Sequence, residues 1–257
     1  MQVYGDVCLP GHYCPNGTAI SQPCPPGTYQ DRDGMTAIEE CLDCEPGQFC
    51  GHFGHTNTTG PCSIGYYCTR GANTSTPTDG LTGDICPAGF YCEEGSHTPA
   101  ACGNGTYMNH TGASACYICP EGYFCVNRDQ ADICRQGYYC PEGTGADLQP
   151  CPLGTFGNTT GLGQVDECTP CTGGYYCGTP GSPDPDGMCD PGYYCSAGVD
   201  IATPTGDPMV NNGTGGLCFE GHFCPRGTAY PQPCAAGTFS LTTGTVISFL
   251  IVLTPNL

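Results

Sequence analysis

Three pairs of cysteines have the spacing Cys-x2-Cys, which is the spacing of zinc ligands and of redox-active dithiols. The pairs are Cys41 with Cys44, Cys116 with Cys119, and Cys168 with Cys171. Zinc-bound thiolates persist in a reducing compartment, and a redox dithiol needs a helix start that activates it. These pairs instead lie in segments rich in glycine and proline, which predict turns. The sequence therefore favours disulfide bonds, with an intracellular zinc-binding protein as a distant alternative.

The cysteine content and the glycosylation signals indicate the compartment. The chain has 25 cysteines in 257 residues, the density of a protein held together by disulfide bonds. Seven asparagines stand in the Asn-x-Ser/Thr acceptor sequence for N-linked glycans: Asn16, Asn57, Asn73, Asn104, Asn109, Asn158 and Asn212. Both features predict an extracellular or cell-surface glycoprotein made in the secretory pathway. No apolar export segment precedes the first cysteine, so we expect the signal peptide to be missing from this chain.

The composition excludes several classes of function. With 41 glycines, 25 prolines and no tryptophan, no large hydrophobic core is expected. The 24 acidic residues against five arginines and no lysine leave no basic face for nucleic acid or an anionic membrane. We expect an extracellular protein or glycan ligand as the partner, and membrane attachment only through a missing segment. The apolar run Val246 to Leu253 is too short for a bilayer, which needs roughly 20 residues.

No enzyme is expected, because a nucleophilic cysteine needs a free thiol beside a base and nearly all cysteines can be assigned to bridges. Without lysine, Schiff-base chemistry and P-loop phosphate binding are excluded. Calcium is the one cofactor considered, because acidic residues cluster twice. The clusters are Asp31, Asp33, Glu39 and Glu40, and then Asp184, Asp186 and Asp190. Neither matches a calcium-binding loop, so we expect solvated acidic loops without a metal.

The cysteines are carried by a repeated element. Cys-x5-Cys occurs nine times, always with an aromatic residue before the second cysteine and a glycine three residues before it: Cys8/Cys14, Cys44/Cys50, Cys62/Cys68, Cys86/Cys92, Cys119/Cys125, Cys134/Cys140, Cys171/Cys177, Cys189/Cys195 and Cys218/Cys224. Such a glycine predicts positive φ or a close chain approach, and the aromatic residue predicts packing on a disulfide. His12 and His222 stand where most copies have Tyr, so we expect packing rather than metal binding.

A longer segment, Cys-x2-Gly-Thr followed by an aromatic residue, completes a module of six cysteines three times. The many turn residues predict short β-hairpins, and hence an elongated, small disulfide-rich, β-poor array without a large hydrophobic core. The expected order is an incomplete repeat at 1–23, module 1 at 24–68, a linker with an extra Cys-x5-Cys loop at 69–101, module 2 at 102–140, module 3 at 151–195, a linker at 196–217, an incomplete repeat at 218–244 and an apolar tail at 245–257.

Three segments, CPPGTYQDRDGMTAIEECLDCEPGQFC (24–50), CGNGTYMNHTGASACYICPEGYFC (102–125) and CPLGTFGNTTGLGQVDECTPCTGGYYC (151–177), resemble the ephrin-receptor-like cysteine-rich repeat. More distantly, they resemble the modules of tumour necrosis factor receptors and the growth-factor-receptor and EGF-like group. The resemblance implies a non-enzymatic binding or spacer module of a cell-surface receptor or adhesion protein, with no catalytic residues. The alternative is a structural component of a secreted matrix or coat.

The resemblance also implies a receptor-type pairing, although six cysteines allow other connectivities. The implied pairs are Cys24 with Cys41, Cys44 with Cys62, Cys50 with Cys68, Cys102 with Cys116, Cys119 with Cys134, Cys125 with Cys140, Cys151 with Cys168, Cys171 with Cys189, and Cys177 with Cys195. Local bridges would then join Cys8 with Cys14, Cys86 with Cys92, and Cys218 with Cys224. Cys234 is left unpaired, because Ile251 stands where modules 1 and 3 have its partner. We expect a chain truncated or mis-joined after Gly244.

Overall fold

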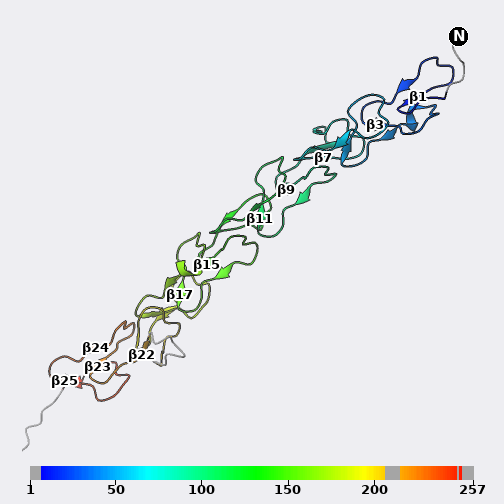
Figure 1. Ribbon diagram of the computed structural model, residues 1–257. Helices are drawn as coiled ribbons and strands as arrows, with labels where there is room; N and C mark the ends of the chain where they lie inside the picture. Colours follow the sequence, from blue (N-terminus) through cyan, green and yellow to red (C-terminus); the bar gives the residue numbers. More distant parts are fainter. Residues whose placement is uncertain (1–6, 206–214, 248, 251–257) are drawn as a thin grey trace, which may run out of the picture. The chain divides into compact units, whose positions relative to one another are not determined.

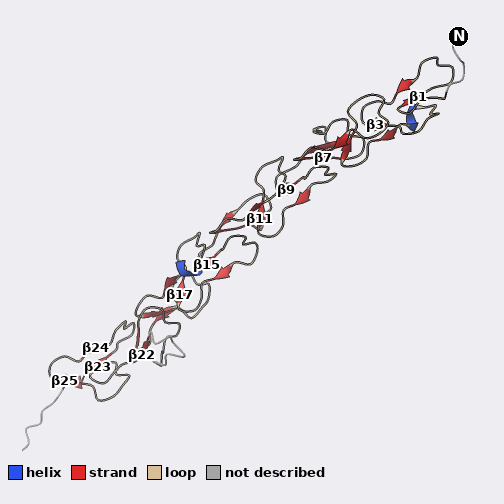
Figure 2. Ribbon diagram, in the orientation of Figure 1, coloured by secondary structure: helices blue, strands red, loops and turns tan. Residues whose placement is uncertain are grey.

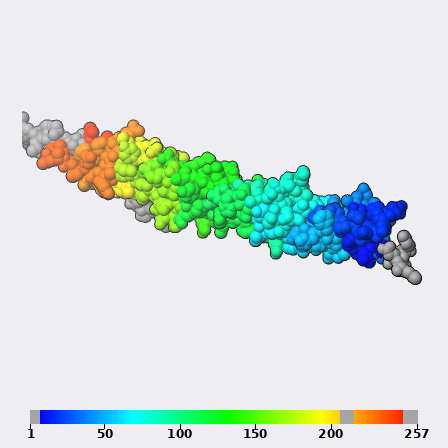
Figure 3. All heavy atoms as spheres, turned by 90° about the horizontal axis from the view of Figure 1, so that it is seen from above, coloured from blue at the N-terminus to red at the C-terminus, as the bar shows by residue number. Residues whose placement is uncertain are grey.

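The computed structural model describes residues 7–205, 215–247 and 249–250. The chain divides into two compact units, which are described separately. The N-terminal unit comprises Met1–Ile118 and Cys125–Ala131, and the C-terminal unit comprises Cys119–Phe124 and Asp132–Leu257. Within each unit the segments follow one another in chain order, as the colours in Figures 1 and 3 show.

The described residues form thirteen two-stranded antiparallel hairpins. Those of the N-terminal unit are β1 (His12–Tyr13) with β2 (Gln22–Pro23), β3 (Thr28–Tyr29) with β4 (Leu42–Asp43), β5 (Gln48–Phe49) with β6 (Gly60–Pro61), β7 (Tyr66–Cys68) with β8 (Gly83–Ile85), β9 (Phe90–Tyr91) with β10 (Ala100–Ala101), and β11 (Thr106–Tyr107) with β12 (Tyr117–Ile118). A 3-10 turn, η1 (Ile38–Glu40), lies between β3 and β4, and is drawn in blue in Figure 2.

The C-terminal unit repeats this arrangement. Its hairpins are β13 (Tyr123–Phe124) with β14 (Asp132–Ile133), β15 (Tyr138–Tyr139) with β16 (Gln149–Pro150), β17 (Thr155–Phe156) with β18 (Thr169–Pro170), β19 (Tyr175–Tyr176) with β20 (Gly187–Met188), β21 (Tyr193–Cys195) with β22 (Gly215–Leu217), β23 (His222–Phe223) with β24 (Gln232–Pro233), and β25 (Thr238–Phe239) with β26 (Phe249–Leu250). The turn η2 (Val165–Glu167) matches η1 in position. The segments 69–101 and 196–217, expected as linkers, contribute β8 to β10 and β22 to these hairpins.

Backbone hydrogen bonds join each hairpin to the next one along the chain. The turn glycine of one hairpin donates its amide to a carbonyl of the following hairpin, as Gly47 does to Cys68 at 2.8 Å. The amide of Cys68 in turn donates to Ser96 at 3.0 Å, and the amide of Gly95 donates back to Cys62 at 2.9 Å. The same pattern recurs in both units, so the polar backbone is satisfied by neighbouring hairpins rather than by wide sheets.

The repeated glycine is required for two physical reasons. All nine glycines of the Cys-x5-Cys loops have positive φ, for example +84° at Gly47 and +83° at Gly137. In addition, a Cβ on Gly47 would lie 2.4 Å from the carbonyl oxygen of Gly95, two hairpins further along. Both the turn geometry and the close approach of the chain therefore exclude a side chain, which confirms the two alternatives predicted from the sequence.

The aromatic residue before the second cysteine covers the bridge of the next hairpin. Phe49 packs against buried Cys62 and Cys68, and Phe124 packs in the same way against Cys134 and Cys140. Each such cluster holds only a few residues, and cysteines make up most of the buried apolar side chains. The predicted fold class is confirmed: short hairpins closed by disulfides, without a large hydrophobic core.

Candidate functional site

Local bridges close the Cys-x5-Cys loops. The structure contains the bridges Cys8–Cys14, Cys44–Cys50, Cys62–Cys68, Cys86–Cys92, Cys134–Cys140, Cys171–Cys177, Cys189–Cys195 and Cys218–Cys224. Cys119 and Cys125, the cysteines of the remaining loop, are both disulfide-bonded. Longer bridges join Cys24 with Cys41, Cys102 with Cys116, and Cys151 with Cys168 across their hairpins.

This pairing corrects the receptor-type connectivity. The structure lacks the implied bridges between hairpins at the described cysteines, namely Cys44 with Cys62, Cys50 with Cys68, Cys119 with Cys134, Cys125 with Cys140, Cys171 with Cys189, and Cys177 with Cys195. The positive-φ glycine folds each loop back on itself and brings the two Cα atoms to 5.7–6.0 Å, which suits a disulfide. Adjacent hairpins are then held by backbone hydrogen bonds instead of sulfur.

The local pairing also removes the zinc and redox interpretations of Cys-x2-Cys. Cys41 is bonded to Cys24, whereas Cys44 is bonded to Cys50. Cys168 and Cys171 are likewise in two different bridges. The two cysteines of such a pair therefore cannot act together as a dithiol or share a zinc ion.

The longer hairpins carry a substitute at the sixth position after the first cysteine, which the sequence analysis missed. The substitutes are Gln30, Met108, Gly157 and Ser240. Gln30 and Met108 are only 2% and 1% exposed, and their amides donate to the next hairpin as a cysteine amide does elsewhere. The substitute therefore makes the same backbone hydrogen bond to the next hairpin as a cysteine would, while the first cysteine forms its disulfide with a cysteine at the far strand of the hairpin.

Cys234 has a free thiol and is partly buried. Ser240 takes the position of a local partner, and its hydroxyl lies 2.5 Å from the hydroxyl of Thr245. Position 251, where a longer bridge would end, lies outside the described residues, as does most of the predicted apolar tail.

The glycosylation acceptor sites lie at the surface wherever they are described. Asn16, Asn57, Asn73, Asn104, Asn109 and Asn158 are all exposed, and Asn212 lies outside the described residues. Several of these side chains stand in hairpin turns whose threonine already makes a local bond, such as Thr106 Oγ1 donating to the carbonyl of Gly103 at 2.9 Å. An exposed asparagine leaves room for a glycan without unfolding the hairpin.

The acidic clusters are engaged locally. Glu40 accepts the amides of Thr36 at 2.5 Å and Ala37 at 2.9 Å, which lowers the pKa of its carboxyl group. Asp186 accepts the amide of Gly178 at 2.6 Å. In the part of the chain that the structure describes, no three His, Cys, Asp or Glu side chains are placed to hold a metal ion.

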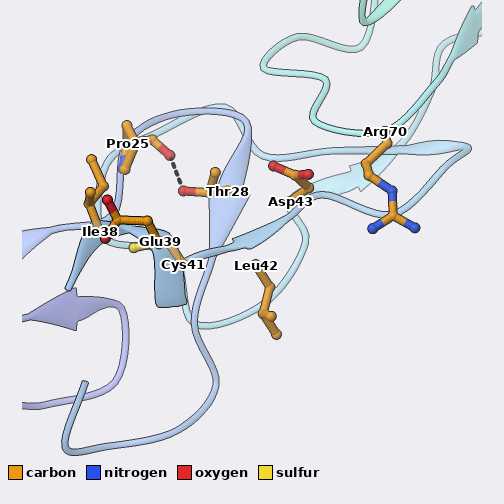
Figure 4. Close-up of a pocket in the computed structure, with 8 residues that line it drawn as sticks. All are labelled: Pro25, Thr28, Ile38, Glu39, Cys41, Leu42, Asp43 and Arg70. Carbon is orange, nitrogen blue, oxygen red and sulfur yellow. Dashed lines mark hydrogen bonds between the residues drawn. The ribbon is translucent and has the colours of Figure 1, made fainter. Parts of the chain in front are cut away.

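A groove of about 460 Å³ lies in the N-terminal unit, around the β3–β4 hairpin. It is lined by Pro25, Thr28, Ile38, Glu39, Cys41, Leu42, Asp43 and Arg70. Figure 4 shows Asp43 and Arg70 toward one end and Ile38 and Glu39 toward the other. Arg70 comes from the loop between β7 and β8, so two hairpins contribute to the groove.

The lining of the groove combines apolar and charged side chains. Ile38 and Leu42 are each 46% exposed, so the groove has apolar surface as well as two carboxylates and a guanidinium. The Thr28 hydroxyl donates to the carbonyl of Pro25 at 2.7 Å, and Cys41 is in a disulfide. The lining therefore offers no activated nucleophile.

The histidines at the Tyr position behave differently from each other. His222 packs edge-on against Phe219, with ring centroids 6.2 Å apart, so it has a packing role. The His12 ring instead faces the backbone of the loop between β5 and β6, where a Cβ on Gly54 would lie 3.5 Å from its Cε1 atom.

None of the described helices is long and apolar enough to cross a membrane.

No model of a known protein family matches the chain. Over 178 residues the chain is 28% identical to the "Sushi, von Willebrand factor type A, EGF and pentraxin domain-containing protein 1" of Mus musculus, and equally to the Rattus norvegicus protein of that name. The match covers 67% of this chain and 4% of each relative, so the chain spans a small part of the relatives' length. Together, the disulfide bonds and this similarity identify a cysteine-rich repeat segment of the extracellular kind.

Proposed function

We propose that the chain is a non-enzymatic binding segment of a larger cell-surface receptor or adhesion protein, built from ephrin-receptor-like repeats. The observation that supports this most strongly is that the hairpins are held together by recurring structural elements of the repeat, while the side chains of the loops between them are exposed. Glycines, cysteines and backbone amides hold the hairpins together, whereas loop side chains such as Phe53 and Leu81 are 68% and 83% exposed. A stack of this kind tolerates changes in its exposed loops, and that freedom suits a recognition surface.

The groove around the β3–β4 hairpin is the proposed contact. Arg70 makes no ion pair among the described residues, and exposed Ile38 and Leu42 line the same groove. The charge of the chain favours a basic partner. The net charge is -19, and the groove carries the carboxylates of Glu39 and Asp43 and one guanidinium, that of Arg70. A basic extracellular protein segment with an apolar side chain fits this surface best.

Glycans belong to the same proposal. The six described acceptor asparagines are exposed, and none of them lines the groove. Asn73 stands beside the groove, since its Cβ lies 3.8 Å from a Cβ placed on Gly27, and a glycan there would border the contact.

The test uses the full chain secreted from eukaryotic cells as a fusion to an antibody Fc segment. Intact mass should show alkylation of 24 of the 25 cysteines only after reduction, and loss of glycan mass after deglycosylation. Binding to cultured cells and to their deposited matrix is then measured for Arg70→Glu and for Arg226→Glu. Arg226 is the matched control, since both arginines stand two residues after the last cysteine of a Cys-x5-Cys loop.

We expect Arg70→Glu to strengthen binding to cells about tenfold, because it replaces the one positive charge of the groove by a third carboxylate facing the basic partner, and Arg226→Glu to leave binding unchanged. Equal binding by both variants would contradict the groove as the contact. Binding to matrix but not to cells would favour the alternative, a structural component of a secreted matrix. The relatives' printed name lists four kinds of domain in one protein, which fits a segment of a larger extracellular protein under either alternative.

A further inference from the structure

An aromatic cluster of Tyr107, His110 and Tyr117 lies on the surface of the β11–β12 hairpin in the N-terminal unit. Tyr107 and Tyr117 are paired across the two strands, and their ring centroids lie 6.0 Å apart. The ring of His110 meets Tyr117 edge-on, also with 6.0 Å between the centroids. Tyr117 nevertheless remains 53% exposed, so the cluster presents an uncovered aromatic ring to solvent.

Hydrogen bonds hold the Tyr117 ring in this position. Nδ1 of His110 lies 3.0 Å from the carbonyl oxygen of Thr111, which can only accept, so in the neutral ring Nδ1 carries the proton. Nε2 of His110 is then an acceptor, and the Tyr117 hydroxyl donates to it at 3.4 Å. Because the ring is already ordered, little conformational entropy is lost when a ligand covers it.

The glycan acceptor Asn109 stands beside this cluster. Met108 is 1% exposed and packs with Cys102 and Cys116, so its side chain faces the bridge. Successive side chains of an extended segment point to opposite faces, which puts Tyr107 and the exposed Asn109 together on the face away from the bridge. Two residues of extended chain span about 6.6 Å. A sugar attached to Asn109 therefore begins next to the aromatic cluster.

We propose that the first sugar of a glycan on Asn109 packs against the aromatic cluster and stabilises the β11–β12 hairpin. The C–H face of an N-acetylglucosamine ring is apolar and slightly positive, and it complements the negative face of an aromatic ring. The covalent link raises the effective concentration of the sugar, so a contact too weak for a free sugar forms within the molecule. The proposal rests on the secretory origin that the proposed function includes, and not on the groove contact.

The corresponding acceptor of the C-terminal unit, Asn158, lacks such a surface. Asn158 and Asn109 stand at the same distance from the first cysteine of their hairpins. Directly after the second bridged cysteine, however, the Asn158 hairpin has Thr169 in place of Tyr117. Phe156, two residues before Asn158, is only 7% exposed. Neither Thr169 nor Phe156 offers an open ring to a glycan, so Asn158 is the matched control.

The test uses the full chain secreted from eukaryotic cells, and the masses of its glycopeptides first show whether Asn109 carries a glycan. Hydrogen exchange then compares the glycosylated chain with two variants that lack this glycan, Asn109→Gln and Thr111→Ala. We expect exchange at the β11–β12 amides to be about fivefold faster in both variants. Asn158→Gln should leave exchange at the β17–β18 amides unchanged.

The Tyr117 ring gives a second readout. In Tyr117→Thr, which copies Thr169, loss of the glycan should no longer change exchange at β11–β12, whereas Tyr117→Phe keeps the ring and should keep the effect. Direct contact is measured by proton NMR on the chain trimmed to one sugar at each site. Signals of the Asn109 sugar, assigned by their loss in Asn109→Gln, should shift upfield over the ring and return to ordinary values in Tyr117→Thr.

Three results would overturn the proposal. They are an Asn109 without a glycan, unshifted protons of the sugar on a glycosylated Asn109, and an equal effect of Asn109→Gln and Asn158→Gln on their own hairpins. None of these results changes the expected binding of the Arg70 variant to cells, so failure of the glycan contact and failure of the groove contact are distinguished.

Discussion

A Cβ atom placed on Gly137 would lie 2.0 Å from the carbonyl oxygen of Gly181. The two glycines are separated by one intervening hairpin, β17–β18, and the amide of Gly181 also donates to Cys151 at 3.0 Å. The backbone of one hairpin thus contacts the loop two hairpins ahead with no room for any side chain. The distance between these hairpins is therefore set by contact of backbone with backbone.

Substituting Gly137 with Ala should therefore loosen the β15–β16 hairpin. The left-handed backbone alone costs about 1–3 kcal/mol for a residue other than glycine, and the clash with Gly181 adds to that cost. Gly198→Ala is the control, because Gly198 has φ of +84° but no atom within 4 Å of its Cβ position. Hydrogen exchange followed by mass spectrometry should show faster exchange at Tyr138 and Tyr139 in the Gly137 variant, by a larger factor than near Gly198 in the control. Equal acceleration of exchange in the two variants would show that the close approach of Gly181 to Gly137 contributes nothing to stability.

The local disulfide pairing predicts a specific pattern of peptides. Digestion with pepsin at acidic pH, which prevents disulfide exchange, cuts at exposed Phe53 between the first two loops of module 1. We expect the Cys44–Cys50 and Cys62–Cys68 bridges to appear in separate peptides without reduction. A peptide pair joined across Phe53 until reduction would instead support the receptor-type connectivity.

Ser240→Cys should convert the unpaired hairpin into a closed Cys-x5-Cys loop. Ser240 is 5% exposed and occupies the position of the second cysteine, six residues after Cys234. The variant should show no free thiol by alkylation, and the short closed loop should raise stability by up to roughly 2–3 kcal/mol. Leu241→Cys is the control, since its side chain is 76% exposed and should leave two free thiols. Two free thiols in Ser240→Cys would show that the loop around Cys234 does not have the repeat geometry.

The loop between β7 and β8 should open at acidic pH. Asp79 accepts hydrogen bonds from the hydroxyl and amide of Thr82, both at 2.8 Å, and from the amide of Leu81 at 2.9 Å. These bonds lower the pKa of Asp79 below its ordinary value of 3.8. A lowered folded-state pKa means that the carboxylate stabilises the loop above the unfolded pKa, and that this contribution is lost as pH falls through the folded value.

Pepsin can measure this opening, because Leu81 is 83% exposed. Cleavage beside Leu81 should be slow at about pH 4 and fast at about pH 2, whereas Asp79→Asn should be cleaved quickly at both. Cleavage at Leu153, which is 52% exposed, gives the pH dependence of pepsin itself. The same pH ratio at Leu81 and Leu153 would show that Asp79 does not hold the loop.

The hairpins and their glycines could be predicted from the sequence, because the constraint on each is local. A glycine such as Gly47 is needed wherever a Cys-x5-Cys loop turns with positive φ, so every copy shows the same pattern. The cysteine pairing could not be predicted, because identical spacing is compatible with a bridge inside one loop and with a bridge to the next. Which of the two bridges forms depends on the distance between adjacent hairpins, and that distance cannot be derived from the residue types.

The groove could not be found in the sequence for a related reason. Arg70 and Asp43 come from different hairpins, and they line one groove only because the loops stack in order. The buried substitutes Gln30 and Met108 were equally hidden, since neither resembles the cysteine whose position it takes.

The described bridges have a mechanical consequence, because each one closes a loop within a single hairpin. Within each unit, force applied along the chain would load the backbone hydrogen bonds and packing between hairpins, such as the bond between Gly47 and Cys68. These contacts would part while the sulfur bonds stay intact. When the tension is relaxed, each Cys-x5-Cys loop is still closed, so the hairpin can form again around it and the extension is reversible.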